Sequence, residues 1–330
     1  MRTTCCLTTA AVLCLCCLFP AAIPADESPG FTAGPAVQAL EPQQSSALTL
    51  PKAVLLGVIE GLTEFLPVSS TAHLAVAERF LGIGRTSAEK RAADAYAIVI
   101  QGGAILAVLL VSLGRIRSMI RGLFGRDRDG LRLLANLAIA FVPAAAIGLL
   151  LEPLRERLYG IWPIVGAWIV GGLLILLLVR ERSAGVRAGA GTPATAGNAL
   201  ESLTWRTSLV IGFAQAVAIW PGVSRSLVTI AAALLLGLSV PAAVEFSFLL
   251  GLITLGAATG YEAVKSGGEI VAAFGVVTPV VGFVVAAACA FVAIRWMVSW
   301  LKTRSLSVFG WYRIGIGAVV AALAFFGVVN

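Results

Sequence analysis

Two carboxylates lie close together in an apolar stretch of the N-terminal half of the chain. Glu60 and Glu64 are four residues apart, so a helix projects both carboxylates from one face. Each acid costs roughly 2.5–3.5 kcal/mol in an apolar membrane segment. A divalent cation or a network of hydrogen-bond donors offsets that cost, and oxygen ligands alone suit Mg²⁺ or Ca²⁺ better than Zn²⁺. The alternative is a pair of acids that lines a wet vestibule without chemistry.

Hydroxyl groups and the only histidine of the chain follow these acids. Ser69, Ser70 and Thr71 stand where a helix is expected to restart after Pro67. The free N–H groups of a helix N-terminus favour phosphate, although the same hydroxyls also suit helix capping. His73 follows Ser70 by three residues, which places both on one helix face. We expect Ser69 and Thr71 to bind a substrate phosphate beside Ser70.

An isolated arginine occurs in a similar setting in the C-terminal half. Arg225 stands between Ser224 and Ser226 and is the only basic residue between Arg206 and Lys265. A guanidinium flanked by hydroxyls can grip a phosphate through two parallel hydrogen bonds. We therefore expect these two serines to contribute to substrate binding. The alternative role of the arginine is that of a counter-ion to the two acids.

Together these residues indicate hydrolysis of a phosphoryl group within a membrane. The arginine and a metal ion would neutralise the phosphates, and Glu64 or His73 would shuttle the proton. Ser70 or a water molecule would attack phosphorus, and the sequence leaves that choice open. Glu245, interpreted as a third buried acid, and Gln215 are candidates of a second tier.

The composition excludes most other classes of protein. Of the 330 residues, 59% are apolar and 12% are charged, and the mean hydropathy is +0.95. A soluble domain has about 45–50% apolar and about 25% charged residues. The net charge of +7 is therefore interpreted as topology charge beside membrane spans rather than as a nucleic-acid surface. A polytopic membrane protein is expected.

The apolar runs predict two kinds of membrane segment. Six runs reach about 19 residues, enough to span a bilayer; they lie near 95–113, 133–151, 161–179, 242–260, 271–294 and 308–329. Four shorter runs form two pairs, each joined by a turn rich in proline, glycine or serine: 53–66 with 70–82, and 208–219 with 226–238. Short interrupted segments in corresponding places of two halves indicate re-entrant hairpins at a buried site.

The two halves of the chain read as copies. Ser69-Ser70-Thr71 aligns with Ser224-Arg225-Ser226, and counting back nine residues pairs Glu60 with Gln215. Three spanning segments separate the hairpins, so the second copy is inverted. The predicted fold is an all-α integral membrane bundle of two inverted repeats, each a re-entrant helix hairpin plus three transmembrane helices. The hairpin tips should meet near mid-membrane and bring the arginine to the acids.

The domain boundaries follow from the same map. The transmembrane domain is expected over 51–330, with repeats over about 51–180 and 207–329 and a cytoplasmic loop over about 180–206. Residues 1–25 resemble a secretory signal peptide, with an uncleaved anchor as the alternative. Residues 26–50 are expected to be a linker.

Loop charges predict the orientation. The loops on one face hold 13 lysines and arginines, against six on the other, which favours the richer face as cytoplasmic. Both termini are then outside. The richer loops are 114–132, 180–206 and 295–304, and the poorer loops are 82–94, 152–160 and 261–270.

The chain resembles the undecaprenyl-diphosphate phosphatases associated with bacitracin resistance. The resemblance covers about residues 50–329 and rests on three segments: Glu60-Gly61-Leu62-Thr63-Glu64-Phe65-Leu66-Pro67-Val68-Ser69-Ser70-Thr71, Pro221-Gly222-Val223-Ser224-Arg225-Ser226 and Glu245-Phe246-Ser247-Phe248-Leu249-Leu250. It implies a hydrolase of the bacterial inner membrane that opens to the periplasm. The implied reaction cuts undecaprenyl diphosphate to the monophosphate and inorganic phosphate, recycling the lipid carrier of cell-wall synthesis with a divalent cation.

The resemblance also assigns roles to single residues. The essential acids, which would hold the Mg²⁺ or Ca²⁺, fall on Glu60 and Glu64, the catalytic hydroxyl on Ser70, the histidine on His73 and the phosphate-binding arginine on Arg225. The expected partners are a polyprenyl diphosphate and membrane lipids, with a homodimer left open and no nucleic acid.

One departure and one competing interpretation stand beside the resemblance. The family usually has glycine before the histidine, where this chain has Ala72. The competing function is a secondary transporter or lipid flippase, because inverted repeats with broken helices are also a transporter architecture. A pure transporter needs no candidate nucleophile beside a phosphate clamp.

Overall fold

The computed structural model describes residues 48–84, 86–155, 159–187, 197–301 and 303–329. These residues form eleven α-helices: α2 (Leu50–Thr63), α3 (Ser70–Leu81), α4 (Ser87–Val111), α5 (Leu113–Leu123), α6 (Arg128–Arg155), α7 (Ile161–Arg187), α8 (Trp205–Ala216), α9 (Arg225–Leu235), α10 (Val240–Phe274), α11 (Val277–Trp300) and α12 (Ser307–Phe325). The described part also contains two 3₁₀ turns, η2 (Leu200–Ser202) and η3 (Val217–Ile219), and an isolated β-bridge between Asn198 and Leu238. The signal-like segment lies outside the described residues.

Six of these helices are long and apolar enough to cross a membrane. The apolar stretches are Glu89–Val111, Arg128–Leu151, Ile161–Arg180, Val240–Tyr261, Val277–Trp300 and Ser307–Phe325. Each overlaps one of the six runs expected from the sequence. The predicted all-helical, multi-pass membrane protein is therefore confirmed.

Two of the segments expected as loops between spans lie mostly outside the candidate spans but are helical. The segment 114–132 contains α5 and the start of α6, because apolar residues recur at helical spacing at Ile116, Met119 and Leu123. The segment 261–270 lies inside α10, which continues until Gly275 at a φ of 65°. A left-handed glycine is a common end of a helix.

Glycines let α5 cross close to α6. A Cβ on Gly122 would lie 2.8 Å from the Cα atom of Leu131, and a Cβ on Gly130 would meet the backbone of Ser118. Asp127 fixes the turn between the helices, since its carboxylate accepts hydrogen bonds from the Ser118 hydroxyl at 2.7 Å and the Gly130 N–H at 2.9 Å.

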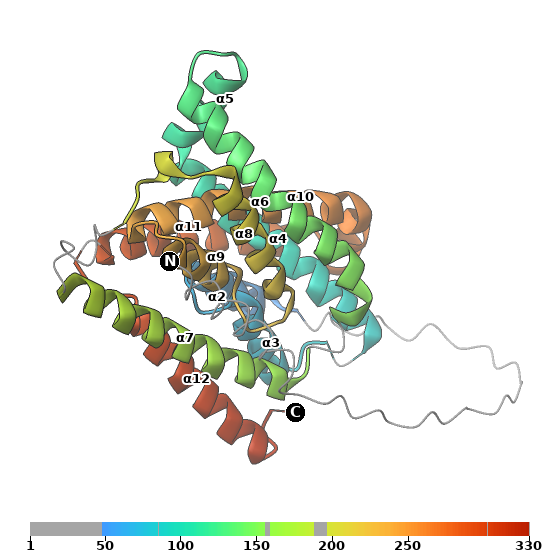
Figure 1. The fold of residues 1–330 in the computed structure, drawn as a ribbon. Coiled ribbons are helices and arrows are strands. Elements are labelled where there is room, and N and C mark those ends of the chain that lie inside the picture. Colours follow the sequence, from blue (N-terminus) through green and yellow to red (C-terminus); the bar gives the residue numbers. More distant parts are fainter. Residues whose placement is uncertain (1–47, 85, 156–158, 188–196, 302, 330) are drawn as a thin grey trace, which may run out of the picture. The chain divides into compact units, whose positions relative to one another are not determined.

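Four of the five short helices in the described part form the two expected hairpins. The first is α2–α3, and the second is α8–η3–α9 (Figure 1). Each packs its first helix on a spanning helix of the other half: α2 lies on α11, and α8 lies on α6. Glycines permit both approaches, because a Cβ on Gly57 would lie 2.8 Å from the Gly282 carbonyl oxygen and one on Gly212 would meet the Ala140 carbonyl.

The last helices of the two halves, α7 and α12, run side by side (Figure 1). Gly172 and Gly310 lie at their crossing, where a Cβ on Gly172 would lie 2.7 Å from the Gly310 carbonyl oxygen. This pair of helices borders the hairpin tips, because side chains from both helices hydrogen-bond to tip backbone, as described below.

Candidate active site

The two acids of the first hairpin are buried at the end of α2. Glu64 is the residue that follows the last turn of α2, and its N–H donates to the Glu60 carbonyl at 2.9 Å. Their exposed fractions are 1% for Glu60 and 9% for Glu64. Such burial of two acids requires positive or hydrogen-bonding partners nearby.

Glu64 has a separate partner on each carboxylate oxygen. Its Oε2 atom accepts a hydrogen bond from the Ser70 hydroxyl, and its Oε1 atom lies 3.3 Å from Arg225 Nη2. The Ser70 contact closes the first hairpin, while the Arg225 contact joins it to the second. The prediction that the tips meet and bring Arg225 to Glu64 is confirmed.

Arg225 begins α9 and is held on several sides. Its Nη1 atom donates to the Ser247 carbonyl at 3.1 Å, and its Cζ atom lies 5.6 Å from the centroid of the Phe65 ring. Gly251 on α10 leaves room for the guanidinium, since a Cβ there would lie 2.6 Å from Arg225 Nη2. The buried Nε atom has no hydrogen-bond partner among the described residues. The Nε–H donor is therefore unsatisfied among the described residues.

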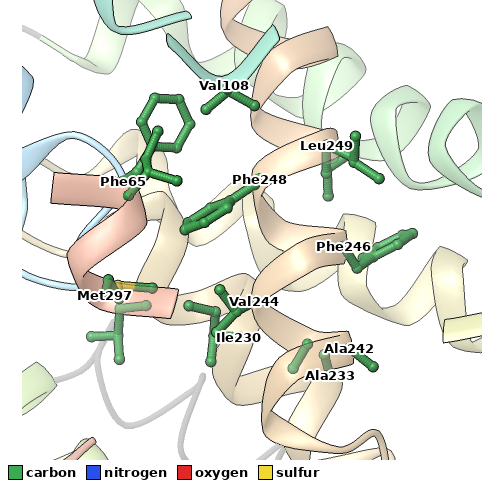
Figure 2. Packing of buried hydrophobic residues seen from close by; sticks show 14 of the residues in the cluster. Phe65, Val108, Ile230, Ala233, Ala242, Val244, Phe246, Phe248, Leu249 and Met297 are labelled. Atoms are coloured by element: carbon green, nitrogen blue, oxygen red, sulfur yellow. The ribbon is translucent and has the colours of Figure 1, made fainter. Parts of the chain in front are cut away.

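Phe65 anchors the acid-bearing tip in the apolar core. Its ring meets Phe248 of α10 edge to face, with the centroids 5.5 Å apart and the planes at 83°. Figure 2 shows Phe65 and Phe248 facing each other in the buried cluster. The ring that packs on α10 thereby fixes the backbone next to Glu64.

The serines of the second tip bind backbone of both hairpins. The Ser226 hydroxyl donates a hydrogen bond to the Leu66 carbonyl at 2.8 Å. The hydroxyl oxygens of Ser224 and Ser226 are hydrogen-bonded at 2.9 Å. Ser224 also caps α9 by accepting from the Leu227 N–H at 3.2 Å. In contrast, Ser69 makes no capping hydrogen bond at the start of α3. The capping alternative offered for the first tip therefore fails at Ser69, and the structure instead shows a cap at Ser224, where none was expected.

His73 lies on the side of α3 that meets α12. Its Nδ1 atom is 2.7 Å from the Ser69 carbonyl oxygen, and its Nε2 atom is 2.9 Å from the Tyr312 hydroxyl. The ring also meets Trp168 edge to face at 5.0 Å. Among the described residues, neither ring nitrogen hydrogen-bonds to Ser70, although the two residues share a helix.

The candidates of the second tier have different surroundings. Gln215 is buried, and its Oε1 atom accepts from the Thr254 hydroxyl at 3.4 Å. Glu245 is not a buried acid, so that expectation was wrong. Its side chain is 37% exposed and binds Arg115 on α5 at 2.7 Å. Because α5 was expected to be loop, the sequence offered no helix to supply this partner.

Thr71 is half-buried in the first turn of α3, next to Ser70. Ala72, which stands where the family usually has glycine, is fully buried. It packs in an apolar cluster that also contains Trp168. The extra methyl group is therefore accommodated by packing.

Glu60 and Glu64 offer some, but not all, of the ligands that a divalent cation needs. The Oε1 atom of Glu60 is buried without a hydrogen-bond partner among the described residues. An orphaned carboxylate oxygen beside a second carboxylate is the donor type that Mg²⁺ and Ca²⁺ take. No group of three histidine, cysteine or acidic side chains that could hold a metal occurs in the described ranges. Substrate oxygens and water would have to complete the coordination.

Sequence reasoning missed two residues at this site, Arg313 and Gly251. Arg313 is a fully buried arginine on α12 that donates to the Pro67 and Gly222 carbonyls of the two tips. A single arginine inside the apolar run 308–329 was the signal that could have found it. Gly251 leaves room for the guanidinium of Arg225, and the sequence alone does not show which glycine has this role.

Fold and site together define a multi-pass helical membrane protein in which two hairpins enclose acids, hydroxyls and an arginine. The family described as "Bacitracin resistance protein BacA" matches residues 53–319. The chain belongs to this family.

Curated relatives cover most of the chain. A protein of Sorangium cellulosum named undecaprenyl-diphosphatase is 46% identical over 270 residues, which make up 81% of this chain and 84% of that protein. Undecaprenyl-diphosphatase 2 of Rhodospirillum rubrum is 40% identical over 282 residues, or 85% and 97% of the two chains. The undecaprenyl-diphosphatase of Methylococcus capsulatus is 38% identical over 283 residues, or 84% and 96%.

Proposed function

We propose that this chain is a membrane hydrolase that converts undecaprenyl diphosphate to undecaprenyl phosphate and inorganic phosphate. It thereby returns the lipid carrier to cell-wall synthesis. The family membership and the names of the relatives support hydrolysis over the transporter alternative.

One observation carries the proposal at the level of residues. Glu64 links the Ser70 hydroxyl of the first hairpin to Arg225 of the second. A candidate nucleophile, a base within hydrogen-bond reach of it and a guanidinium with a spare donor therefore occur together. This combination suits attack on phosphorus.

The proposed reaction has two steps. Ser70 gives its proton to Glu64 and attacks the terminal phosphorus; the bond from that phosphorus to the bridging oxygen breaks, and undecaprenyl phosphate leaves. Glu64 passes the proton to solvent. Water then attacks the phosphorus of the phosphoserine while Glu64 takes a proton from that water. The bond from phosphorus to the Ser70 oxygen breaks, Glu64 returns the proton to that oxygen, and inorganic phosphate leaves. Arg225 stabilises the charge on the phosphoryl oxygens in both steps.

The two acids are proposed to hold Mg²⁺ or Ca²⁺ together with the diphosphate. The orphaned oxygen of Glu60 supports this assignment. A divalent ion at this point supplies positive charge that the single guanidinium cannot, because two carboxylates and a diphosphate are all anionic.

The side chain of His73 is proposed to act by orientation. Its two nitrogens lie against the Ser69 carbonyl and the Tyr312 hydroxyl, so it can fix the backbone just before Ser70. This arrangement supports a role in placing the hydroxyl rather than in attacking phosphorus.

The proposed setting is the bacterial inner membrane, with the site open to the periplasm and both termini outside. The excess of basic residues in the loops on the opposite face supports this orientation. The crossed packing of α2 on α11 and of α8 on α6 supports the two inverted repeats.

The test is phosphate release from undecaprenyl diphosphate in detergent micelles. Transport needs a sealed membrane, so release in micelles reports hydrolysis alone. We expect the wild-type protein to release phosphate and Glu64→Gln to lose nearly all of this activity. An inactive wild-type protein, or an equally active Glu64→Gln variant, would contradict the proposal.

A further inference from the structure

Arg313 is a charged residue that the proposed reaction does not use. It is 0% exposed and lies in α12, one of the six apolar spans. None of the ion pairs among the described residues includes it. A guanidinium buried in a membrane span is costly, so its presence indicates a specific task.

The guanidinium of Arg313 contacts the tips of both hairpins. Its Nη1 atom donates to the Pro67 carbonyl at 3.2 Å, and its Nη2 atom donates to the Gly222 carbonyl at 2.8 Å. These residues hold corresponding places, each two residues before the serine that precedes α3 or α9, which are Ser69 and Ser224. One side chain therefore binds the same point of the two hairpins.

The same guanidinium is fastened to α7. It donates from Nη2 to the Ala167 carbonyl at 2.8 Å and from Nε to the Trp168 carbonyl at 3.4 Å. Gly171 leaves the space for it, since a Cβ there would lie 2.8 Å from Arg313 Cζ. The indole of Trp168 adds a hydrogen bond to the Val68 carbonyl at 2.8 Å.

The chemistry of the tips explains why this task needs arginine. Backbone carbonyls outside a helix are tolerated at membrane depth only when protein or water satisfies them. Arginine offers five N–H donors in a planar fork, whereas lysine offers three donors from one atom. Only the fork can reach carbonyls of α7 and of both tips at once.

We propose that Arg313 is a positioning residue that sets the distance between the reacting groups of the two hairpins. Pro67 lies three residues from both Glu64 and Ser70, and Gly222 lies three residues before Arg225. A shift of either tip therefore moves the acid and the hydroxyl relative to the arginine that faces them. This inference rests on the proposed phosphatase activity.

The test compares Arg313→Lys with wild type in the phosphate-release assay. We expect kcat to fall about 10²-fold, the cost of misplacing reacting groups by about 1 Å, with KM changed by less than about threefold. The matched control is Arg295→Lys, the same change at an exposed arginine of α11, which should retain wild-type kcat. A residue needed only for folding would lower the yield of active protein and leave the kcat of the folded fraction unchanged.

A double-mutant cycle tests the route of the effect. If Arg313 acts by placing Arg225, then Arg313→Lys should cost less than about threefold in an Arg225→Lys background. Full multiplication of the two losses would overturn the inference. If Arg313→Lys does not fold, the kcat of Gly171→Ala tests the inference instead. The added methyl group displaces the guanidinium of Arg313 without removing it. A wild-type kcat in Gly171→Ala would overturn the inference. An inactive wild-type protein would instead reject the proposed function.

Discussion

Ser69 and Ser224 have the same uncommon backbone conformation, with φ of 73° and 75°. They are the only residues other than glycine with positive φ among the described ranges. Each immediately precedes the second helix of its hairpin. Strained residues of this kind persist where the surrounding structure holds them, and they cluster at functional sites.

The variant Ser69→Gly tests separately whether Ser69 strains the backbone and whether its hydroxyl binds the substrate. Glycine accepts positive φ freely, and the Ser69 hydroxyl makes no cap, so Ser69→Gly should melt at or above the wild-type temperature. Loss of a hydrogen bond to a substrate phosphate should lower phosphate release about tenfold. Thermal melting and phosphate release check the two parts. Unchanged release would remove the Ser69 hydroxyl from substrate binding.

Ser70→Ala tests the nucleophile. The variant should lose about 10³-fold or more of the activity, the scale of nucleophile deletion in other hydrolases. Acid-quenched wild-type enzyme should carry phosphate on Ser70, detectable by mass spectrometry. The neighbouring change Thr71→Ala is the control and should cost about tenfold at most. Activity of Ser70→Ala close to that of wild type, without a phosphoserine in the wild-type protein, would assign the attack to water.

The proposed metal predicts a response that does not depend on turnover. Mg²⁺ or Ca²⁺ should raise the melting temperature of the wild-type protein, because a ligand that binds only the folded state stabilises it. Glu60→Gln should weaken this shift, since it removes the charge from the orphaned carboxylate. EDTA should also abolish phosphate release, and added Mg²⁺ or Ca²⁺ should restore it. Full activity of demetallated enzyme would refute the metal and leave the acid–base assignment standing.

Glu245→Gln is expected to change phosphate release by less than about threefold, because Glu245 binds Arg115 and not the site. The hydrogen bond from Arg115 to Glu245 holds the pKa of Arg115 above its ordinary value. This arginine therefore stays charged at every assay pH. Glu60→Gln, at an acid of the site, is the comparison and should lose most activity. A comparable loss in Glu245→Gln would place Glu245 in the reaction.

The sequence predicted those parts of the fold that leave local signals. Apolar runs located the six spans, and the turns at Pro67 and Pro221 located the hairpins. The meeting of Arg225 and Glu64 followed because buried charges in an apolar chain must find partners.

The sequence could not predict hydrogen bonds to backbone carbonyls or close packing that depends on the absence of a side chain. Arg313 binds the carbonyls of Pro67 and Gly222, which are 246 and 91 residues away in sequence, and a carbonyl carries no residue identity. The packing of Arg225 against Gly251 likewise depends on a missing side chain. The pairing of Glu245 was missed because α5 was interpreted as loop.

The most direct test of a site shared by the two hairpins is phosphate release by Arg225→Lys. Lysine keeps the charge beside Glu64 but lacks the planar fork of donors. We predict that the variant keeps a wild-type melting temperature and loses about 10²–10³-fold in kcat, as expected for removal of a donor to the transition state. Turnover of Arg225→Lys at the wild-type rate would contradict the account, because Arg225 would then be only a counter-ion to Glu64.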